Sequence, residues 1–274
     1  MATGEAFTLV TGASTGIGRE LALIAAAKGR SIVLVARSEA KLSELARWIR
    51  EVHLARAEVV ALDLSDPEAP DALFQELTRR NVDVEVLINN AGFGSLGRVH
   101  ETPLDRQLEM LRLNVLALTH LTRLFLPAML GRGRGRILNV ASTAGLQPGP
   151  WMAVYYASKA YVLSFSEALA EELRGTGVTS TALLPGPTRT EFQTRADMAG
   201  SGLVRFGMAD ARDVAEAGYR GMEAGKAVVI PGFGNNALSL LVRLSPRWAV
   251  RRVVSWLNRG TRDNSPTPNR SPRA

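Results

Sequence analysis

The sequence contains no cysteine, few aromatic residues and only three histidines. The lack of cysteine excludes disulfides, thiolate metal sites and a thiol nucleophile. His53, His100 and His120 are not closely spaced, so we expect no metal site. No apolar run reaches the roughly 18 residues that span a membrane, and the N-terminus lacks the pattern of a secretion signal. We therefore expect a cytoplasmic protein.

Acidic residues are scarce at the C-terminal end. From Arg243 onward there are eight arginines and one acid, Asp263, whereas residues 1–242 contain 25 basic and 25 acidic residues. The net charge of +7 and the pI of about 10.3 therefore come from this end of the chain. We expect no nucleic-acid partner.

The rest of the chain alternates short apolar segments with helical patterns. Segments typical of buried strands lie at 7–10, 31–36, 58–64, 84–90, 136–142, 178–185 and 227–230. Helical patterns cover 16–28, 39–52, 68–80, 103–129, 151–174 and 210–223. We predict an α/β fold, a single Rossmann-type domain with a doubly wound, parallel, seven-stranded sheet and helices on both faces.

A glycine-rich turn joins the first strand to the first helix. The stretch TLVTGASTGIG places Gly12, Gly16 and Gly18 in a G-x-x-x-G-x-G spacing, with Ser14 and Thr15 between them. Glycine lets the backbone approach a phosphate, and the helix N-terminus adds free N–H groups and a positive dipole end. No Gly-Lys-Ser/Thr follows, so a Walker A loop is excluded. The turn predicts a dinucleotide phosphate site, with a plain structural turn as the alternative.

Arg37 follows the second strand, where an acidic residue would bind the ribose hydroxyls of NAD. An arginine at that place can hold a 2′-phosphate by charge-assisted hydrogen bonds. We therefore predict NADP (NADPH) as cofactor. A surface arginine at the start of a helix is the alternative, and Arg19 is a weaker candidate for the same contact.

The stretch VYYASKAY (154–161) places Tyr155 and Tyr156 within one helical turn of Lys159. Spacing alone does not choose between the two tyrosines. A tyrosine hydroxyl titrates at about 10, and a nearby ammonium group would lower that pKa. Such a tyrosine would serve as general acid in carbonyl reduction and as general base in the reverse reaction.

Together these motifs resemble the short-chain dehydrogenase/reductase family over residues 7–231. The resemblance rests on TGASTGIG (11–18), NNAG (89–92), Asn114, Ser142, YYASK (155–159) and PGPT (185–188). The family pattern Tyr-x-x-x-Lys selects Tyr155 as the catalytic tyrosine and leaves Tyr156 and Tyr161 as packing residues.

The resemblance implies a catalytic set of Asn114, Ser142, Tyr155 and Lys159. Ser142 would donate to the substrate oxygen, Lys159 would also bind the nicotinamide ribose, and Asn114 would hold a relay water. A cap at Ser142 and a satisfied helix kink at Asn114 are the structural alternatives. The implied cofactor-binding residues are Gly12, Ser14, Thr15, Gly16, Ile17, Gly18, Arg37, Asp63, Leu64, Asn90, Ala91, Gly92, Tyr155, Lys159, Pro185, Gly186 and Thr188.

The function that follows is an NADP-dependent oxidoreductase that interconverts a carbonyl and an alcohol, acting mainly as a reductase. A catalytically silent NADP-binding regulator is the alternative, and the family implies a dimer or tetramer. The apolar residues of 189–208 (Phe192, Met198 and Phe206) suggest a lipophilic or bulky substrate. We expect Phe93, Trp151 and Met152 on the opposite wall.

We assign residues 1–236 to the dinucleotide-binding and catalytic domain, 237–260 to a basic amphipathic helical extension and 261–274 to a disordered tail. Pro246 should kink the extension. An apolar arc follows it, formed by Ala249, Val250, Val253, Val254, Trp256 and Leu257. We favour packing of this arc on protein, and peripheral membrane contact is the alternative.

Overall fold

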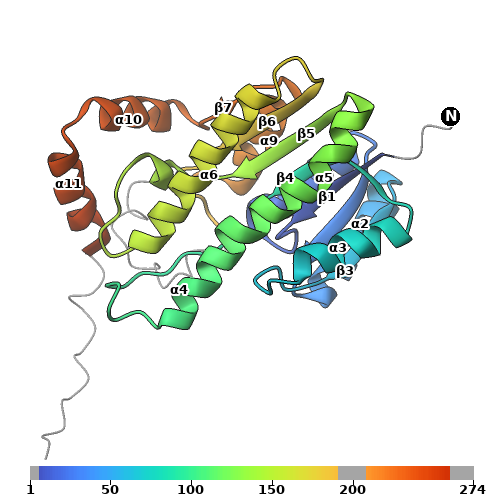
Figure 1. Ribbon diagram of the computed structural model, residues 1–274, viewed down its shortest axis with the longest axis horizontal. Coiled ribbons are helices and arrows are strands. Elements are labelled where there is room, and N and C mark those ends of the chain that lie inside the picture. Colours follow the sequence, from blue (N-terminus) through green and yellow to red (C-terminus); the bar gives the residue numbers. More distant parts are fainter. Residues whose placement is uncertain (1–5, 191–207, 260–274) are drawn as a thin grey trace, which may run out of the picture.

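The computed structural model describes residues 6–190 and 208–259. One parallel sheet has the strand order β3-β2-β1-β4-β5-β6-β7 (Figure 1). Its strands are β1 (Ala6–Thr11), β2 (Ser31–Ala36), β3 (Ala57–Ala61), β4 (Asp83–Asn89), β5 (Gly135–Val140), β6 (Val178–Leu183) and β7 (Val228–Val229). The predicted doubly wound, seven-stranded α/β fold is confirmed.

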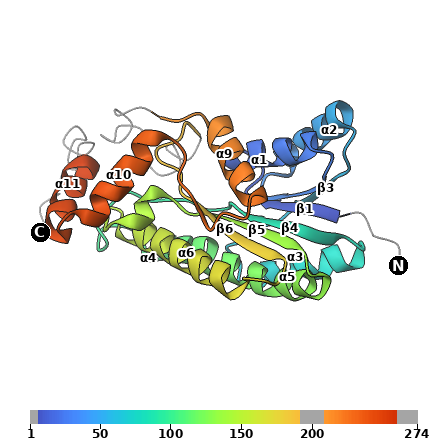
Figure 2. The same ribbon diagram turned by 90° about the horizontal axis from the view of Figure 1, so that it is seen from above.

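The helices lie in two layers, one on each face of the sheet (Figure 2). One layer contains α1 (Gly16–Ala27), α2 (Glu39–His53) and α9 (Ala211–Glu223). The other contains α3 (Ala69–Arg79), α4 (Leu104–Leu111), α5 (Leu118–Arg132) and α6 (Ala153–Glu172). The sequence predicted one helix over 103–129, but a π-helical segment, Arg112–Ala117, separates α4 from α5.

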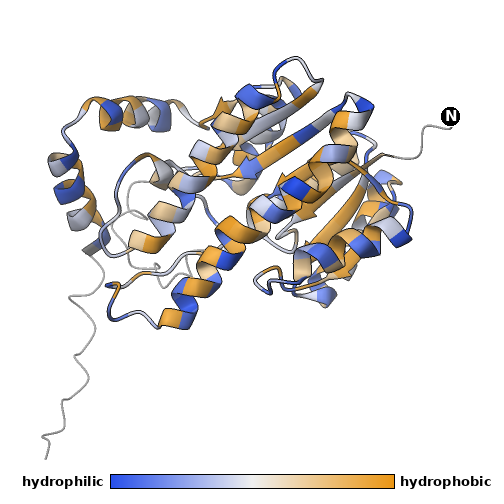
Figure 3. Ribbon diagram, viewed as in Figure 1, coloured by the Kyte–Doolittle hydropathy of each residue, from blue (hydrophilic) through white to orange (hydrophobic). Residues whose placement is uncertain are grey.

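Alternation of side chains along the strands explains the two layers. Ile32 and Leu34 of β2 pack on the face of α1 and α2, while Val33 and Val35 pack on the opposite face. Each such buried side chain contributes about 1.5–3 kcal/mol of hydrophobic stabilisation. The central strands are therefore hydrophobic along most of their length (Figure 3).

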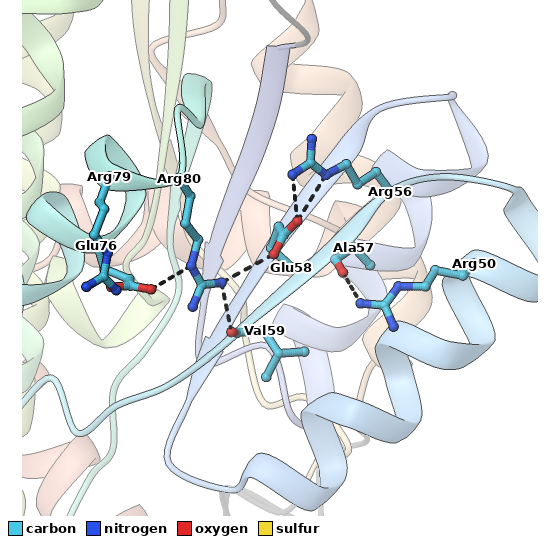
Figure 4. A network of polar contacts seen from close by, with 8 residues as sticks. All are labelled: Arg50, Arg56, Ala57, Glu58, Val59, Glu76, Arg79 and Arg80. Carbon is cyan, nitrogen blue, oxygen red and sulfur yellow. Dashed lines mark hydrogen bonds and ion pairs between the residues drawn. The ribbon is translucent and has the colours of Figure 1, made fainter.

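The outer strand β3 has an open edge, which arginines cover. The carbonyls of Ala57 and Val59 accept hydrogen bonds from Arg50 and Arg80. Glu58 holds Arg80 in place with an Nη1–Oε2 distance of 3.2 Å (Figure 4). These guanidinium groups occupy backbone acceptors that another strand would otherwise pair with.

Within the described residues, one helical stretch, Leu104–Arg132, is long and apolar enough to cross a membrane. Leu121, Phe125 and Met129 of this stretch are buried in the core against the sheet. We interpret it as a core helix.

The strands β2 and β3 are added on one side of β1, and β4 to β7 are added on its other side. The order of the strands therefore reverses between the neighbours β1 and β4. In such sheets a crevice opens at the carboxyl ends of the strands, at this switch point. Two further helices, α10 (Phe233–Leu244) and α11 (Arg247–Arg259), extend from one end of the molecule (Figures 1 and 2). The helical extension therefore starts at Phe233, four residues before the predicted boundary.

Candidate active site

The turn between β1 and α1 forms one end of a large cavity. Gly12 and Gly16 have φ angles of +65° and +56°, which favour glycine. A Cβ at Gly12 would lie 2.9 Å from the Cα of Ala91. Asn90 Nδ2 donates to the carbonyls of Thr11 (2.9 Å) and Gly12 (3.2 Å). The segment after β4 thus holds the turn in position.

The N-terminus of α1 faces this cavity through Ser14, Thr15, Gly16 and Ile17. Thr15 is the N-cap residue, but its side chain makes no capping hydrogen bond. The first N–H groups of α1 also lack intrahelical partners, which suits an anionic phosphate. Gly18 does not line the cavity, because it packs on the turn, where a Cβ would lie 2.4 Å from the Gly12 carbonyl oxygen. Its role is to let the helix approach the turn.

Arg37, directly after β2, lies at the cavity wall between two carboxylates. Its Nη1 is 3.6 Å from Asp63 Oδ2 and 3.7 Å from Glu109 Oε1. Burial alone would raise the pKa of Asp63, but hydrogen bonds from Ser65 and the charge of Arg37 lower it. Sequence reasoning missed Glu109, because only the packing of α4 brings it beside β2. Arg19 pairs with its neighbour Glu20 and does not line the cavity.

Asp63 and Leu64 were expected to end the third strand. The strand instead ends at Ala61, and both residues follow it along the cavity wall. They lie with Arg37 at the carboxyl ends of neighbouring strands, as an adenosine site requires.

Three of the four predicted catalytic side chains, Ser142, Tyr155 and Lys159, line the same cavity. Ser142 lies two residues past β5, and the other two are one turn apart on α6. A hydrogen bond joins Tyr155 to Ser142. The Ser142 hydroxyl also accepts from the Ala144 N–H at 3.1 Å, so it caps the short 3₁₀ helix Thr143–Leu146 at the same time.

Burial controls the titration of Tyr155 and Lys159. Removal from water raises the pKa of Tyr155 to about 12, and the hydrogen bond with Ser142 offsets part of that rise. Burial lowers the pKa of Lys159 to about 8, and its Nζ donates to the Val140 carbonyl at 2.7 Å. The expected lowering of the Tyr155 pKa by Lys159 is wrong for the protein alone, because desolvation of the phenolate dominates.

The other two tyrosines have different surroundings. Tyr156 is buried beside the Tyr155 ring, and burial raises its pKa while a hydrogen bond with Asn258 of α11 opposes that rise. Tyr161 is exposed, and its hydroxyl lies 2.9 Å from Thr119 Oγ1. Only Tyr155 lies beside Ser142, which supports the choice between the tyrosines.

Asn114 lies in the π-helical segment and does not line the cavity. Its Nδ2 donates to the Phe93 carbonyl and to Ser158 Oγ, each at 3.0 Å. Its Oδ1 accepts from the Phe93 N–H at 3.1 Å. The side chain therefore ties the segment after β4 to α6, a role that differs from the expected helix kink, and its contact with a relay water stays a prediction.

The nicotinamide end of the predicted site follows β6. Pro185, Gly186 and Thr188 line the cavity there. Thr188 Oγ1 donates to the Gly186 carbonyl at 2.9 Å, and Thr188 pairs with Ala209 in an isolated parallel bridge. A Cβ at Gly186 would lie 2.6 Å from Asn235 Oδ1, so α10 begins close to this end of the cavity.

One cavity of about 1330 Å³ connects these groups. Pockets for a drug-sized ligand measure about 300–1,000 Å³, so the volume accommodates a cofactor together with a substrate. Beyond Tyr155 the lining is apolar and includes Phe93, Leu146, Met152, Leu238, Val242, Val250 and Val254. The last four belong to α10 and α11, and their position could not be read from the amphipathic pattern alone.

The structure brings only some of the residues expected at the substrate wall to the cavity. Phe93 and Met152 line the cavity, but Trp151 does not and lies under the guanidinium group of Arg98, 4.8 Å from its ring centroid. Phe192, Met198 and Phe206 lie outside the described residues.

Residues 6–199 match the short chain dehydrogenase family. This match covers most of the chain, so the protein belongs to that family. It is similar to a very-long-chain 3-oxoacyl-CoA reductase from Phaeosphaeria nodorum, with 37% identity over 63% of this chain and 52% of the relative. It is also 32% identical to a 7beta-hydroxysteroid dehydrogenase from Collinsella aerofaciens, over 66% of this chain and 68% of the relative.

The chain spans about half the length of several very-long-chain 3-oxoacyl-CoA reductases that it matches. Among solved structures it resembles a short-chain dehydrogenase from Sphingobium yanoikuyae in complex with NADPH. The TM-score is 0.78, with 30% identity over 88% of this chain and 96% of the other.

The cavity of this chain fits the predicted cofactor, NADP. Gly12, Gly16 and Gly92 line it without a Cβ, so the backbone is open to a pyrophosphate and a ribose. Arg37 supplies a cation near the adenosine end, and Lys159 supplies an ammonium donor near the reacting end. A structure of a related short-chain dehydrogenase contains the same cofactor in its reduced form.

Proposed function

We propose that this protein is an NADP-dependent oxidoreductase that interconverts a carbonyl and an alcohol, acting mainly as a reductase of a lipophilic or bulky ketone or aldehyde. The observation that carries the proposal is the single cavity that joins the glycine turn, Arg37, the Ser142–Tyr155–Lys159 group and an apolar wall. Phosphate binding, proton transfer and substrate binding thus share one continuous space.

NADPH, when bound, supplies the hydride. Ser142 donates a hydrogen bond to the carbonyl oxygen and stabilises its developing negative charge. Tyr155 keeps its proton at neutral pH, because burial raises its pKa to about 12, and it can deliver that proton to an alkoxide, which is the stronger base. Lys159 binds the ribose and places positive charge near the phenol. The raised pKa of Tyr155 keeps the hydroxyl protonated, which is the form that reduction requires.

The apolar wall supports the substrate class. Phe93, Met152 and Val250 cluster with Tyr155, and Leu238 lines the same cavity. Arg106 adds a cation at the wall, stacked on Phe93 at 4.2 Å. Relatives named for very-long-chain 3-oxoacyl-CoA and for 7β-hydroxysteroids act on large lipophilic ketones or alcohols. A lipophilic carbonyl compound fits this wall better than a small sugar.

The first experiment follows NADPH absorbance with a panel of carbonyl compounds and compares Tyr155→Phe with Tyr156→Phe. We expect Tyr155→Phe to lower kcat by roughly three orders of magnitude with NADPH binding retained, because the proton donor is lost. Tyr156→Phe should keep most of the activity, since its hydroxyl lies beside Asn258 of α11. The reverse ranking would show that the wrong hydroxyl was chosen. NADPH binding without turnover of any compound would favour the silent regulator.

A further inference from the structure

The helix α11 contacts the rest of the protein through a few side chains on one of its faces. Val250 and Val254 of α11 are 8% and 4% exposed and pack in a cluster with Met152, Tyr155 and Tyr156. Farther along α11, Asn258 Nδ2 donates to the carbonyl of Pro150 at 2.9 Å. Protein packing, the favoured expectation, therefore accounts for one face of α11 only.

Many of the other side chains of α10 and α11 are apolar and open to solvent. Eight of the seventeen large hydrophobic side chains that are exposed in the described residues belong to α10 and α11. Leu244, Trp248 and Trp256 are 77%, 57% and 71% exposed. We call this surface the outer face; it consists of Phe233, Leu238, Leu240, Leu241, Leu244, Trp248, Val253 and Trp256. Figure 3 shows hydrophobic and hydrophilic residues interleaved along both helices.

The charged residues of α10 and α11 are all of one sign. Residues 233–259 contain five arginines and no acidic residue. Arg243, Arg247, Arg251 and Arg252 are exposed, and the Arg252 guanidinium lies 5.5 Å from the centroid of the Trp248 ring. Arginine and tryptophan beside exposed leucines suit the headgroup region of an anionic bilayer. A second copy of this face would instead place arginine against arginine.

The outer face is continuous with the wall of the catalytic cavity. Leu238, Leu241, Val253 and Trp256 are exposed to solvent and also line the cavity that reaches Tyr155. An apolar path therefore runs from the surface of α10 and α11 to the reacting end. A compound dissolved in a bilayer under this face could enter the cavity without crossing water.

We propose that the outer face of α10 and α11 docks this protein on anionic phospholipid membranes and turns the mouth of the cavity toward the lipid. The apolar side chains enter the interface while the arginines bind phosphate headgroups, so both features contribute to one binding event. The docking itself is independent of catalysis. Delivery of a lipophilic carbonyl substrate from the bilayer rests on the proposed function.

The test is co-sedimentation of the full chain with phosphatidylcholine vesicles that contain either no phosphatidylglycerol or about 30% of it. We expect binding to the anionic vesicles only, and weaker binding in high salt. Leu244→Ser/Trp248→Ser should reduce binding roughly tenfold, because both side chains leave the interface. Neither residue lines the cavity, so NADPH binding and turnover of a water-soluble carbonyl compound should be unchanged.

The matched control is Leu54→Ser/Trp48→Ser, which also removes one exposed leucine and one exposed tryptophan. Trp48 lies on α2 and Leu54 directly follows that helix. The control should bind anionic vesicles as the wild type does. Failure of the wild type to sediment, or equal loss in both double variants, would overturn the proposal. A fall in oligomer mass for the outer-face variant, without vesicle binding by the wild type, would show an interface between copies. The vesicle result stands even if no carbonyl compound is turned over.

Discussion

At the scale of single residues, burial decides the charge states in the active site. Tyr155 and Lys159 are both removed from water, and each is shifted toward its neutral form. The lysine donates its hydrogen bond to a backbone carbonyl, and the tyrosine shares one with Ser142. The sequence suggests that the charge of Lys159 acts directly on the Tyr155 phenol. In the structure, burial of both side chains has the larger effect on their pKa values.

Lys159 should make stability depend on pH. Its pKa is about 8 in the folded protein and 10.5 in the unfolded reference, so the unfolded chain binds more protons between these values. The free energy of unfolding therefore rises with pH over that window, by about 2 kcal/mol from pH 8 to 10. Urea unfolding without nucleotide should show that Lys159→Met loses this rise, whereas Lys226→Met at an exposed site keeps it. Equal pH profiles for wild type and Lys159→Met would contradict the shift.

Arg37 should determine the choice between NADPH and NADH. A 2′-phosphate would compete with Asp63 and Glu109 for its guanidinium group, and charge-assisted hydrogen bonds make the phosphate the stronger partner. We expect Arg37→Asp to lower the NADPH/NADH ratio of kcat/KM by at least about tenfold. Arg19→Asp is the control, since Arg19 pairs with Glu20 away from the cavity. An unchanged ratio in Arg37→Asp would remove this residue from the cofactor site.

At the scale of elements, the turn between β1 and α1 depends on close backbone contacts. Asn90 bonds this turn to the segment after β4, and Gly18 lets the helix approach it. The same helix leaves its N-terminal N–H groups open to the cavity. Strand, turn and helix thus form a phosphate site only as one packed unit.

Gly12→Ala should separate packing from backbone strain. Gly12 and Gly29 have similar positive φ angles, +65° and +75°, so alanine costs about 1–2 kcal/mol of strain at either place. A Cβ at Gly12 would also collide with Asn90 and Ala91, whereas a Cβ at Gly29 meets nothing within 4 Å. We expect NADPH fluorescence titration to show binding weakened by roughly tenfold or more for Gly12→Ala only. Equal loss in both variants would mean that strain alone explains the effect.

At the scale of the whole molecule, apolar side chains are exposed in several places, and we expect two of these surfaces to bind partners. One is the outer face of α10 and α11. The other lies on the helical layer that contains α4, α5 and α6, where Leu108, Leu116 and Tyr161 are exposed. The helices of the first carry arginines and no acidic residue, whereas the second carries both signs of charge, with Asp105 and Arg112 exposed, so we assign them to different partners.

The second surface should hold copies of this chain together. Burial of apolar area contributes about 25 cal/mol per Å², so an acidic side chain at its centre should weaken assembly. We expect light scattering to show a dimer or tetramer for the wild type and a smaller mass for Leu116→Glu. Leu130→Glu, at the far end of α5, should leave the mass unchanged. A monomeric wild type would contradict the expected oligomer.

The sequence by itself determined the sheet and the glycine turn, because these depend on local patterns, and the family pattern selected Tyr155 where the spacing left two tyrosines open. Short continuous apolar runs, glycine spacing and the Tyr–Lys spacing are properties of neighbouring residues. The tertiary structure alone decided the pKa values of Tyr155 and Lys159, the Glu109 contact with Arg37, and the side of α11 that faces the cavity. Each depends on desolvation or on contacts between segments distant in the chain, and no local pattern encodes those.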